Sequence, residues 1–210
     1  MTKLSVNINK IATLRNSRGG NVPNLLSVAA DLQDFGAQGI TIHPRPDQRH
    51  IKYDDALALP SVLNTEFNIE GNPITKFVDL VNRIKPDQVT LVPDDENALT
   101  SNKGWDSIKH RDFLKEVINE FQGNGIRTSI FVDPDEKMVE GAKATGTNRI
   151  ELYTEAYAKN YQKNPEKAIA PYVKAAKVAN KLGIGINAGH DLNLVNTAFF
   201  AKKIPQLLEV

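Results

Sequence analysis

Cysteine is absent from the 210 residues of the chain, which excludes disulfides, thiolate metal sites and cysteine nucleophiles. No apolar run reaches the roughly 18 to 20 residues that cross a bilayer, and the opening MTKLSVNINK holds no stretch of signal-peptide length. An excess of one charge is also missing, because 26 Lys and Arg against 25 Asp and Glu give a net charge of +1. We therefore expect a soluble, cytoplasmic protein that binds neither nucleic acid nor membranes, and any basic site must be local.

Short runs rich in Val, Ile and Thr alternate with longer segments of helical periodicity along the whole chain. The helical segments lie at 24–37, 74–86, 113–125, 136–146 and 166–183. No linker interrupts the alternation, which predicts one domain over 1–210. The runs predict seven strands, at 4–9, 39–44, 66–71, 88–93, 127–133, 149–154 and 183–189.

This repeat predicts a parallel α/β sheet, either open and doubly wound or closed as a barrel. Strands under helices on both faces are nearly continuous in apolar residues. Here Ile40 and Ile42 alternate with Thr41 and His43. One apolar face and one polar face favour a (β/α)8 TIM barrel, with chemistry at the carboxyl ends of the strands.

The last five residues, 206–210, fall where an eighth strand would begin. We therefore expect a barrel truncated after seven βα units, with the C-terminal strand and helix missing from this chain.

Three of the four histidines follow predicted strands. His43 ends the second strand, His50 lies in the loop after it, and His190 ends the seventh. The carboxyl ends of barrel strands converge on one mouth, so the three imidazoles are candidates for acid and base chemistry. His110 receives no role.

Glu70 is the carboxylate that we expect at the mouth, because the two-residue period puts it on the polar side with Glu66 and Asn68. Partial burial would raise the pKa of such a carboxyl toward the range of a general base. A structural ion pair is the competing interpretation. Glu151 shares the inward phase and is a weaker candidate.

Two loops carry clusters of cations that suit phosphate. After the first strand come Lys10, Arg15, Arg18 and two glycines, and after the second come Arg45, Arg49 and His50. Surface loops often hold arginines, so each cluster alone is equally consistent with a solvated surface. The loop after the fourth strand adds polar groups and an aromatic ring, at Thr100, Ser101, Asn102 and Trp105.

Two other chemistries stay open. His43, His190 and Glu70 would also suit a site of two histidines and one carboxylate for a metal, although the close histidine pairs that usually accompany such sites are missing. Lys10 would suit a Schiff base, although nothing in the sequence indicates a lowered pKa.

Seven segments together resemble the family of pyridoxine 5′-phosphate synthases: VNINKIATLRNSRGG, GITIHPRPDQRHI, TEFNIEG, QVTLVPDDENALTSNKGWD, SIFVDPD, RIELYT and GINAGHDLNL. The resemblance covers essentially the whole chain and implies a TIM barrel and a homo-octamer. It also implies condensation of 3-amino-2-oxopropyl phosphate with 1-deoxy-D-xylulose 5-phosphate, releasing phosphate and water, with no metal or organic cofactor.

The resemblance also assigns roles to single positions. His43 and Glu70 match the general bases, and His190 matches the general acid. Asn7, Arg18 and Asp191 match positions that hold the aminoketone phosphate, with glycine common at the position of Asp191. The deoxyxylulose phosphate is contacted at the positions of Asn9, Lys10, Arg45, His50 and Thr100.

Two departures from the family pattern limit this transfer. The first strand usually ends in Asn-Ile-Asp-His, whereas this chain has Asn-Ile-Asn9-Lys10, an amide and an ammonium group. The family also continues into an eighth strand with a Gly-His pair that binds phosphate. A catalytically impaired barrel that binds phosphorylated ligands or partner subunits, and a metal-dependent hydrolase or lyase, therefore remain as alternatives.

Overall fold

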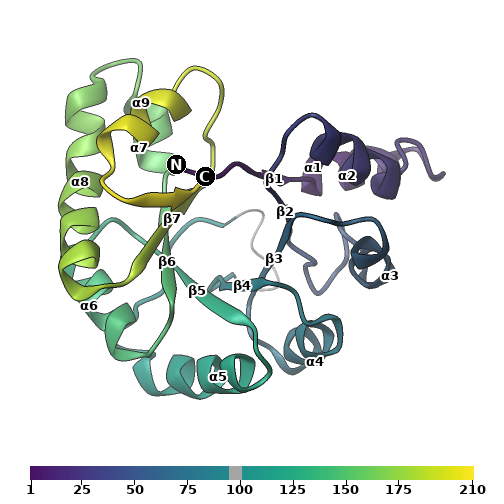
Figure 1. Ribbon diagram of the computed structural model, residues 1–210, viewed down its shortest axis with the longest axis horizontal. Coiled ribbons are helices and arrows are strands. Elements are labelled where there is room, and N and C mark those ends of the chain that lie inside the picture. The colour runs from purple at the N-terminus through teal and green to yellow at the C-terminus, as the bar shows by residue number, and fades with distance from the viewer. Residues whose placement is uncertain (95–100) are drawn as a thin grey trace. The chain divides into compact units, whose positions relative to one another are not determined.

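The computed structural model describes residues 1–94 and 101–210, which divide into two compact units (Figure 1). The N-terminal unit comprises Lys3–Ser101 and Phe121–Arg127. The C-terminal unit comprises Met1–Thr2, Asn102–Glu120 and Thr128–Val210.

The N-terminal unit contains four parallel strands in sequence order, with helices between them. Its strands are β1 (Ser5–Asn7), β2 (Gly39–Ile42), β3 (Glu66–Gly71) and β4 (Gln88–Leu91). Its helices are α1 (Asn9–Ser17), α2 (Leu25–Asp34), α3 (Tyr53–Ala58), the 3-10 turn η1 (Leu59–Ser61) and α4 (Thr75–Ile84).

The C-terminal unit repeats the pattern, and β5 to β8 pair in parallel in sequence order. Its strands are β5 (Arg127–Val132), β6 (Arg149–Tyr153), β7 (Gly185–Gly189) and β8 (Leu207–Glu209). The helices of this half of the chain are α5 (Arg111–Gly123), α6 (Glu136–Ala144), α7 (Glu155–Asn160), α8 (Pro165–Leu182) and α9 (Thr197–Lys203).

Parallel strands that alternate with helices confirm the predicted α/β fold of the TIM-barrel type. All seven predicted strands are present. The chain's last residues add β8, which pairs with β7 through Ile186 and Leu207. The start of an eighth strand predicted at 206–210 is thus a three-residue strand in the structure.

Strand registry confirms the predicted separation of polar and apolar faces. In the N-terminal unit Thr41 pairs with Asn68, and Asn68 pairs with Gln88, so these polar residues share a face. The opposite face carries Ile40, Ile42, Phe67, Ile69, Val89 and Leu91, each at most 4% exposed. Burial of this apolar face supplies the driving force that holds the strands to the helices.

The polar segment after the first strand differs from its prediction. It was expected to be a loop, but Asn9–Ser17 form helix α1, so Lys10 lies in a helix and not at the end of a strand. The segment lacks an apolar stripe, since only Ala12 and Arg15 of this helix are buried. Hydrophobic periodicity could not reveal such a helix.

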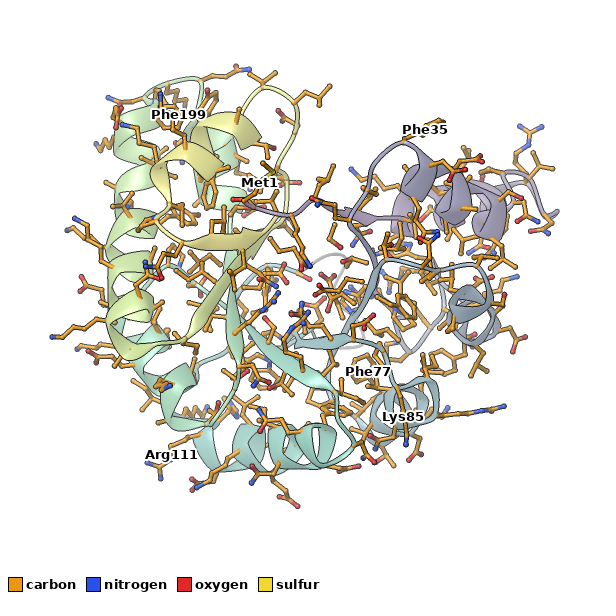
Figure 2. All side chains as sticks on the ribbon, in the orientation of Figure 1. Met1, Phe35, Phe77, Lys85, Arg111 and Phe199 are labelled. Atoms are coloured by element: carbon orange, nitrogen blue, oxygen red, sulfur yellow. The ribbon has the colours of Figure 1, made fainter. Side chains whose placement is uncertain are left out.

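Helix α4 packs closely against the end of β3. A Cβ atom added to Gly71 would lie 2.3 Å from the ring of Phe77, which Figure 2 labels on α4. Glycine at the strand end therefore lets the aromatic ring approach the backbone. Phe35, which follows α2, is by contrast 83% exposed (Figure 2).

Among the described residues, no helix combines the length and the apolar character that a membrane span requires.

Candidate functional site

A continuous hydrogen-bonded layer covers the polar face of the N-terminal sheet. Asn68 is 2% exposed and donates to Thr41 Oγ1 over 3.3 Å. Its Oδ1 accepts hydrogen bonds from Thr90 Oγ1 and Gln88 Nε2 over 3.1 and 3.3 Å. Buried polar groups are tolerated when they are paired in this way. This face of the sheet is therefore polar and hydrogen-bonded within itself.

Glu66 and Glu70 lie on this same face of β3, four residues apart along the strand. Glu66, at the start of the strand, forms ion pairs with Lys3 and Arg127. Its role is thus structural. Glu70 lies at the other end and is partly exposed, next to Thr90 in the register. Glu70 therefore lies on the polar face of the strand, as predicted.

His43 directly follows β2 and lies in a small pocket of the N-terminal unit. The residue is 8% exposed. Its backbone N–H donates to Asn9 Oδ1 over 2.9 Å, which fixes the strand end to α1. The pocket is lined by His43, Pro44, Arg45, Pro46, Tyr53, Asn72, Ile74, Phe77 and Asp94.

Burial is the largest cause that lowers the pKa of His43, and together with the charges of Arg45 and His50 it brings this pKa to about 3. The imidazole is consequently neutral at physiological pH and has a free lone pair for a proton. A phosphate placed against Arg45 would offset one of these positive charges and raise the proton affinity of His43.

Arg45 is 4% exposed and forms an ion pair with Asp94 at 3.2 Å. Asp94 Oδ2 also accepts a hydrogen bond from Ser101 over 2.7 Å, and the Asp94 carbonyl accepts one from Asn72 over 2.8 Å. Asp94 and Asn72 were not among the candidates from sequence. The only available signal was that Asp94 is the first charged residue after β4. Thr100 lies outside the described residues.

The cations and amides around α1 have separate roles. Asn7 Oδ1 accepts the backbone N–H of Asn9 over 2.9 Å, and Asn7, Lys10 and Arg18 are exposed. Arg15 is only 5% exposed and makes two short bonds to Asp55, of 2.6 and 2.7 Å. Arg15 is therefore a structural residue, and the predicted phosphate cluster of this segment is reduced to Lys10 and Arg18.

His50 lies in the loop between β2 and α3, with partial exposure. Its Nδ1 is 2.9 Å from Thr13 Oγ1 on α1. Burial lowers the pKa of His50, and Arg45 and Arg49 lower it further, against smaller opposing effects of Asp47 and the Arg49 backbone.

His190 directly follows β7 in the C-terminal unit. Its ring packs edge-on against Tyr153, with 4.9 Å between ring centroids, and its Nδ1 lies 3.3 Å from Asp191 Oδ2. Thr154 Oγ1 lies within hydrogen-bond distance of the carbonyls of Gly189 and His190, between which its single hydrogen is shared. The end of β6 thus holds the turn that carries the imidazole.

His190 and Asp191 have φ values of 91° and 59°, in the region that glycine adopts freely. Asparagine and aspartate tolerate this region better than most residues, which explains how Asp191 replaces the glycine common in the resembling family. The side chain of Asp191 is half exposed.

Glu151 in β6 pairs with Asn187 of β7, so both side chains lie on the same face of the sheet, and Glu151 is 8% exposed. This agrees with the prediction that Glu151 lies on the polar face of its strand. A Cβ added to Gly189 would lie 2.4 Å from the Glu151 carboxylate. Glycine lets the carboxylate lie this close to the turn, and a Cβ here would displace the end of the Glu151 side chain.

Replacing Gly189 by alanine should force the Glu151 carboxylate to move, and lower the free energy of unfolding by about 1 kcal/mol, the low end of the range for overpacking, because the displaced atom ends a flexible side chain. Urea denaturation would measure the change. The matched control is Gly123→Ala, since a Cβ at Gly123 meets nothing within 4 Å. Equal midpoints for both variants would contradict the close contact.

Within residues 1–94 and 101–210, no group of three or more His, Asp or Glu side chains gathers as a metal site would need. The structure positions the imidazole and carboxylate candidates at strand ends: His43 and Glu70 in the N-terminal unit, and His190 in the C-terminal unit.

Comparison with known proteins identifies the family. The model of the family "Pyridoxal phosphate biosynthesis protein PdxJ" matches residues 4–210. Pyridoxine 5′-phosphate synthase of Flavobacterium johnsoniae is 69% identical over 210 residues, which are 100% of this chain and 89% of that protein. The synthase of Bacteroides fragilis strain YCH46 is 61% identical with the same coverage.

Solved structures agree at the level of the fold. A phosphoribosylanthranilate isomerase from Thermotoga maritima has a TM-score of 0.58 at 17% identity, and the match covers 100% of this chain and 87% of that one. A structure described as native KDPGal has a TM-score of 0.59 at 13% identity, covering 99% and 81%. The full-length match to the family model and the high identity to the synthases together show that this chain belongs to the PdxJ family of pyridoxine 5′-phosphate synthases, enzymes of vitamin B6 biosynthesis.

Proposed function

We propose that this enzyme condenses 3-amino-2-oxopropyl phosphate with 1-deoxy-D-xylulose 5-phosphate, forming pyridoxine 5′-phosphate, inorganic phosphate and water, with no metal or organic cofactor. The observation that carries the proposal is the pocket of the N-terminal unit. There a buried, neutral imidazole, His43, lines the same pocket as the guanidinium of Arg45. A base beside a fixed cation suits proton abstraction from a phosphorylated substrate.

In this proposal His43 and Glu70 accept protons, and His190 donates one. Ring closure requires an amine to attack a ketone, water and phosphate to leave, and a carbon–carbon bond to form, so protons move at several atoms. Each correctly positioned acid or base typically contributes about 10²- to 10⁴-fold to the rate. Holding the two substrates together contributes further, through effective concentration.

Substrate contacts are assigned on the same basis. Asn7, Arg18 and Asp191 would bind the aminoketone phosphate, and the exposed Arg18 is free to meet an anion from solution. Asn9, Lys10, Arg45, His50 and Thr100 would bind the ketose phosphate. Lys10 is a point charge in place of the usual imidazole, so it would bind phosphate without accepting a hydrogen bond.

The assembly is part of the proposal. In it, the two compact units work as one domain over 1–210, the chains form a homo-octamer, and the enzyme acts in the cytoplasm on small phosphorylated molecules.

The test is to incubate the purified protein with both substrates and to follow the absorbance of pyridoxine 5′-phosphate together with phosphate release. We expect both signals to rise together and neither to rise when one substrate is omitted. A chelator should leave the rate unchanged. Absence of product would support the impaired, ligand-binding barrel, and loss of activity with the chelator, restored by zinc or iron, would support the metal-dependent alternative.

A further inference from the structure

One face of α1 contacts the segment that carries both histidines of the N-terminal unit. Asn9, Thr13 and Asn16 follow the i, i+4, i+7 spacing that aligns side chains on a helix. Asn9 Oδ1 accepts the His43 backbone N–H, and Asn16 Nδ2 donates to the carbonyl of His50 over 2.7 Å. Between them, Thr13 Oγ1 meets the His50 ring at 2.9 Å. The helix thus fixes the backbone at both histidines and one imidazole directly.

The hydrogen bonds of Thr13 bear on which ring nitrogen of His50 carries a proton. A hydroxyl has one hydrogen and two lone pairs. Thr13 Oγ1 donates that hydrogen to the carbonyl of Asn9 over 3.0 Å, and a carbonyl can only accept. When this hydrogen bonds the Asn9 carbonyl, the same oxygen faces His50 with a lone pair, and the 2.9 Å contact then requires the proton on His50 Nδ1.

The surroundings of His50 favour a neutral ring. Arg45 and Arg49 lie close enough to lower the pKa of His50 in addition to the effect of burial, while Asp47 and the Arg49 carbonyl oppose them. A neutral imidazole with its proton on Nδ1 leaves a lone pair on Nε2.

We propose that Thr13 is a positioning residue that holds His50 in the Nδ1–H tautomer, so that Nε2 accepts a hydrogen bond from a hydroxyl of the ketose phosphate. The substrate part of this inference rests on the proposed function. His50 then recognises a hydroxyl group and not a phosphate, and Arg45 supplies the charge for the anion. In this arrangement His50 Nε2 distinguishes a substrate with the hydroxyl from an analogue that lacks it. Binding of the analogue would leave Nε2 without a hydrogen-bond donor, which weakens binding.

The tautomer can be measured in the free protein. The chain has four histidines, so ¹⁵N-labelled imidazoles give few signals, and His50→Gln assigns the one from His50. We expect a protonated Nδ1 and an unprotonated Nε2 in the wild type. Thr13→Val, which keeps the shape and removes the hydroxyl, should shift His50 toward the Nε2–H tautomer, and Thr13→Ser should restore the wild-type pattern.

The matched control is Thr197→Val. Thr197 Oγ1 makes the same bond to a carbonyl four residues earlier, on Asn193, over 2.7 Å, in the C-terminal unit. This variant should leave the His50 signals unchanged. An Nε2–H tautomer in the wild type, or one tautomer shared by the wild type and Thr13→Val, would overturn the proposal.

Steady-state kinetics provide the second readout. For Thr13→Val we expect KM for the ketose phosphate to rise about tenfold, the effect of losing one hydrogen bond, with a much smaller change in kcat. KM for the aminoketone phosphate should stay constant, and Thr13→Ser should recover the ketose KM. Equal changes for both substrates would contradict a role through His50. If the wild type forms no product, the proposed function fails, whereas the NMR measurement still decides the role of Thr13.

Discussion

Product formation by the His43→Gln enzyme is expected to be slower than wild type by about 10²- to 10⁴-fold in kcat/KM, because a positioned base contributes that much to a proton transfer. Glutamine has no basic lone pair of comparable strength, but it fits the volume and stays neutral in a site that is 8% exposed. The backbone bond from residue 43 to Asn9 is independent of the side chain, so the strand end should remain in place. Steady-state kinetics, with one substrate varied while the other is saturating and then the reverse, would measure the loss in kcat/KM.

His110→Gln is the matched control. His110 precedes α5 and packs edge-on against Trp105, with 5.4 Å between ring centroids, and the pocket of His43 is lined by other residues. This variant should keep wild-type kcat/KM. If His43→Gln also kept it within a factor of about three, His43 would not be the base, and a different group would have to accept the proton.

Unfolding at acid pH tests the neutral state of His43 separately from catalysis. The pKa of His43 is about 3 in the folded state and 6.5 for an unperturbed imidazole, so between these values the unfolded chain binds the proton more readily. The contribution of His43 is thus fully present above pH 6.5 and is lost as the pH falls toward 3. From pH 7 to 4.5, its share of the loss is roughly 2 to 3 kcal/mol. Urea unfolding of His43→Gln should show a correspondingly weaker acid dependence, and equal slopes for both proteins would contradict a buried neutral imidazole.

Local sequence was sufficient to predict the sheet and the polar positions on it. The alternation of Ile40, Thr41 and Ile42 follows from the two-residue period of a strand, and that period also put Asn68 and Glu70 on one face. Histidines that follow strand ends could be recognised for the same reason. These predictions needed no knowledge of which residues meet across the fold.

Contacts between loops and helices could not be predicted in this way. Asp94 meets Arg45 across 49 residues of sequence, and Thr13 meets His50 across 37. Each pair depends on how two loops or helices pack, and neither side chain belongs to a periodic pattern. From the sequence, Arg45 was predicted to belong to a cationic cluster that binds phosphate. In the structure its guanidinium already forms an ion pair with Asp94, which the sequence could not indicate.

Helix α1 is bound to α3 by an ion pair between residues 40 positions apart in the sequence, and breaking this ion pair should have a large effect on stability. Arg15 is 5% exposed and binds both oxygens of Asp55, which also accepts the Lys52 N–H at the start of α3. Arg15→Met should lower the free energy of unfolding by about 3 kcal/mol, because it leaves a largely buried carboxylate without its cation. Chemical denaturation at neutral pH would measure the difference.

We expect the loss of stability on removing a cation to depend on how buried the ion pair is and not on its N–O distance. A second ion pair in the chain, with the same distance and more exposed side chains, is the control. Lys203 and Glu166 lie 2.6 Å apart, the same distance as the closest Arg15–Asp55 contact, but their side chains are 37% and 65% exposed. Lys203→Met should cost at most about 1 kcal/mol, since water solvates the carboxylate that remains. The double variant Arg15→Met/Asp55→Asn should recover part of the loss, because no unpaired charge is left and asparagine can still accept the Lys52 N–H. If Arg15→Met cost no more than Lys203→Met, α1 would be held by something other than this ion pair. The positions of Thr13 and Asn16 on the same helix would then need another physical cause.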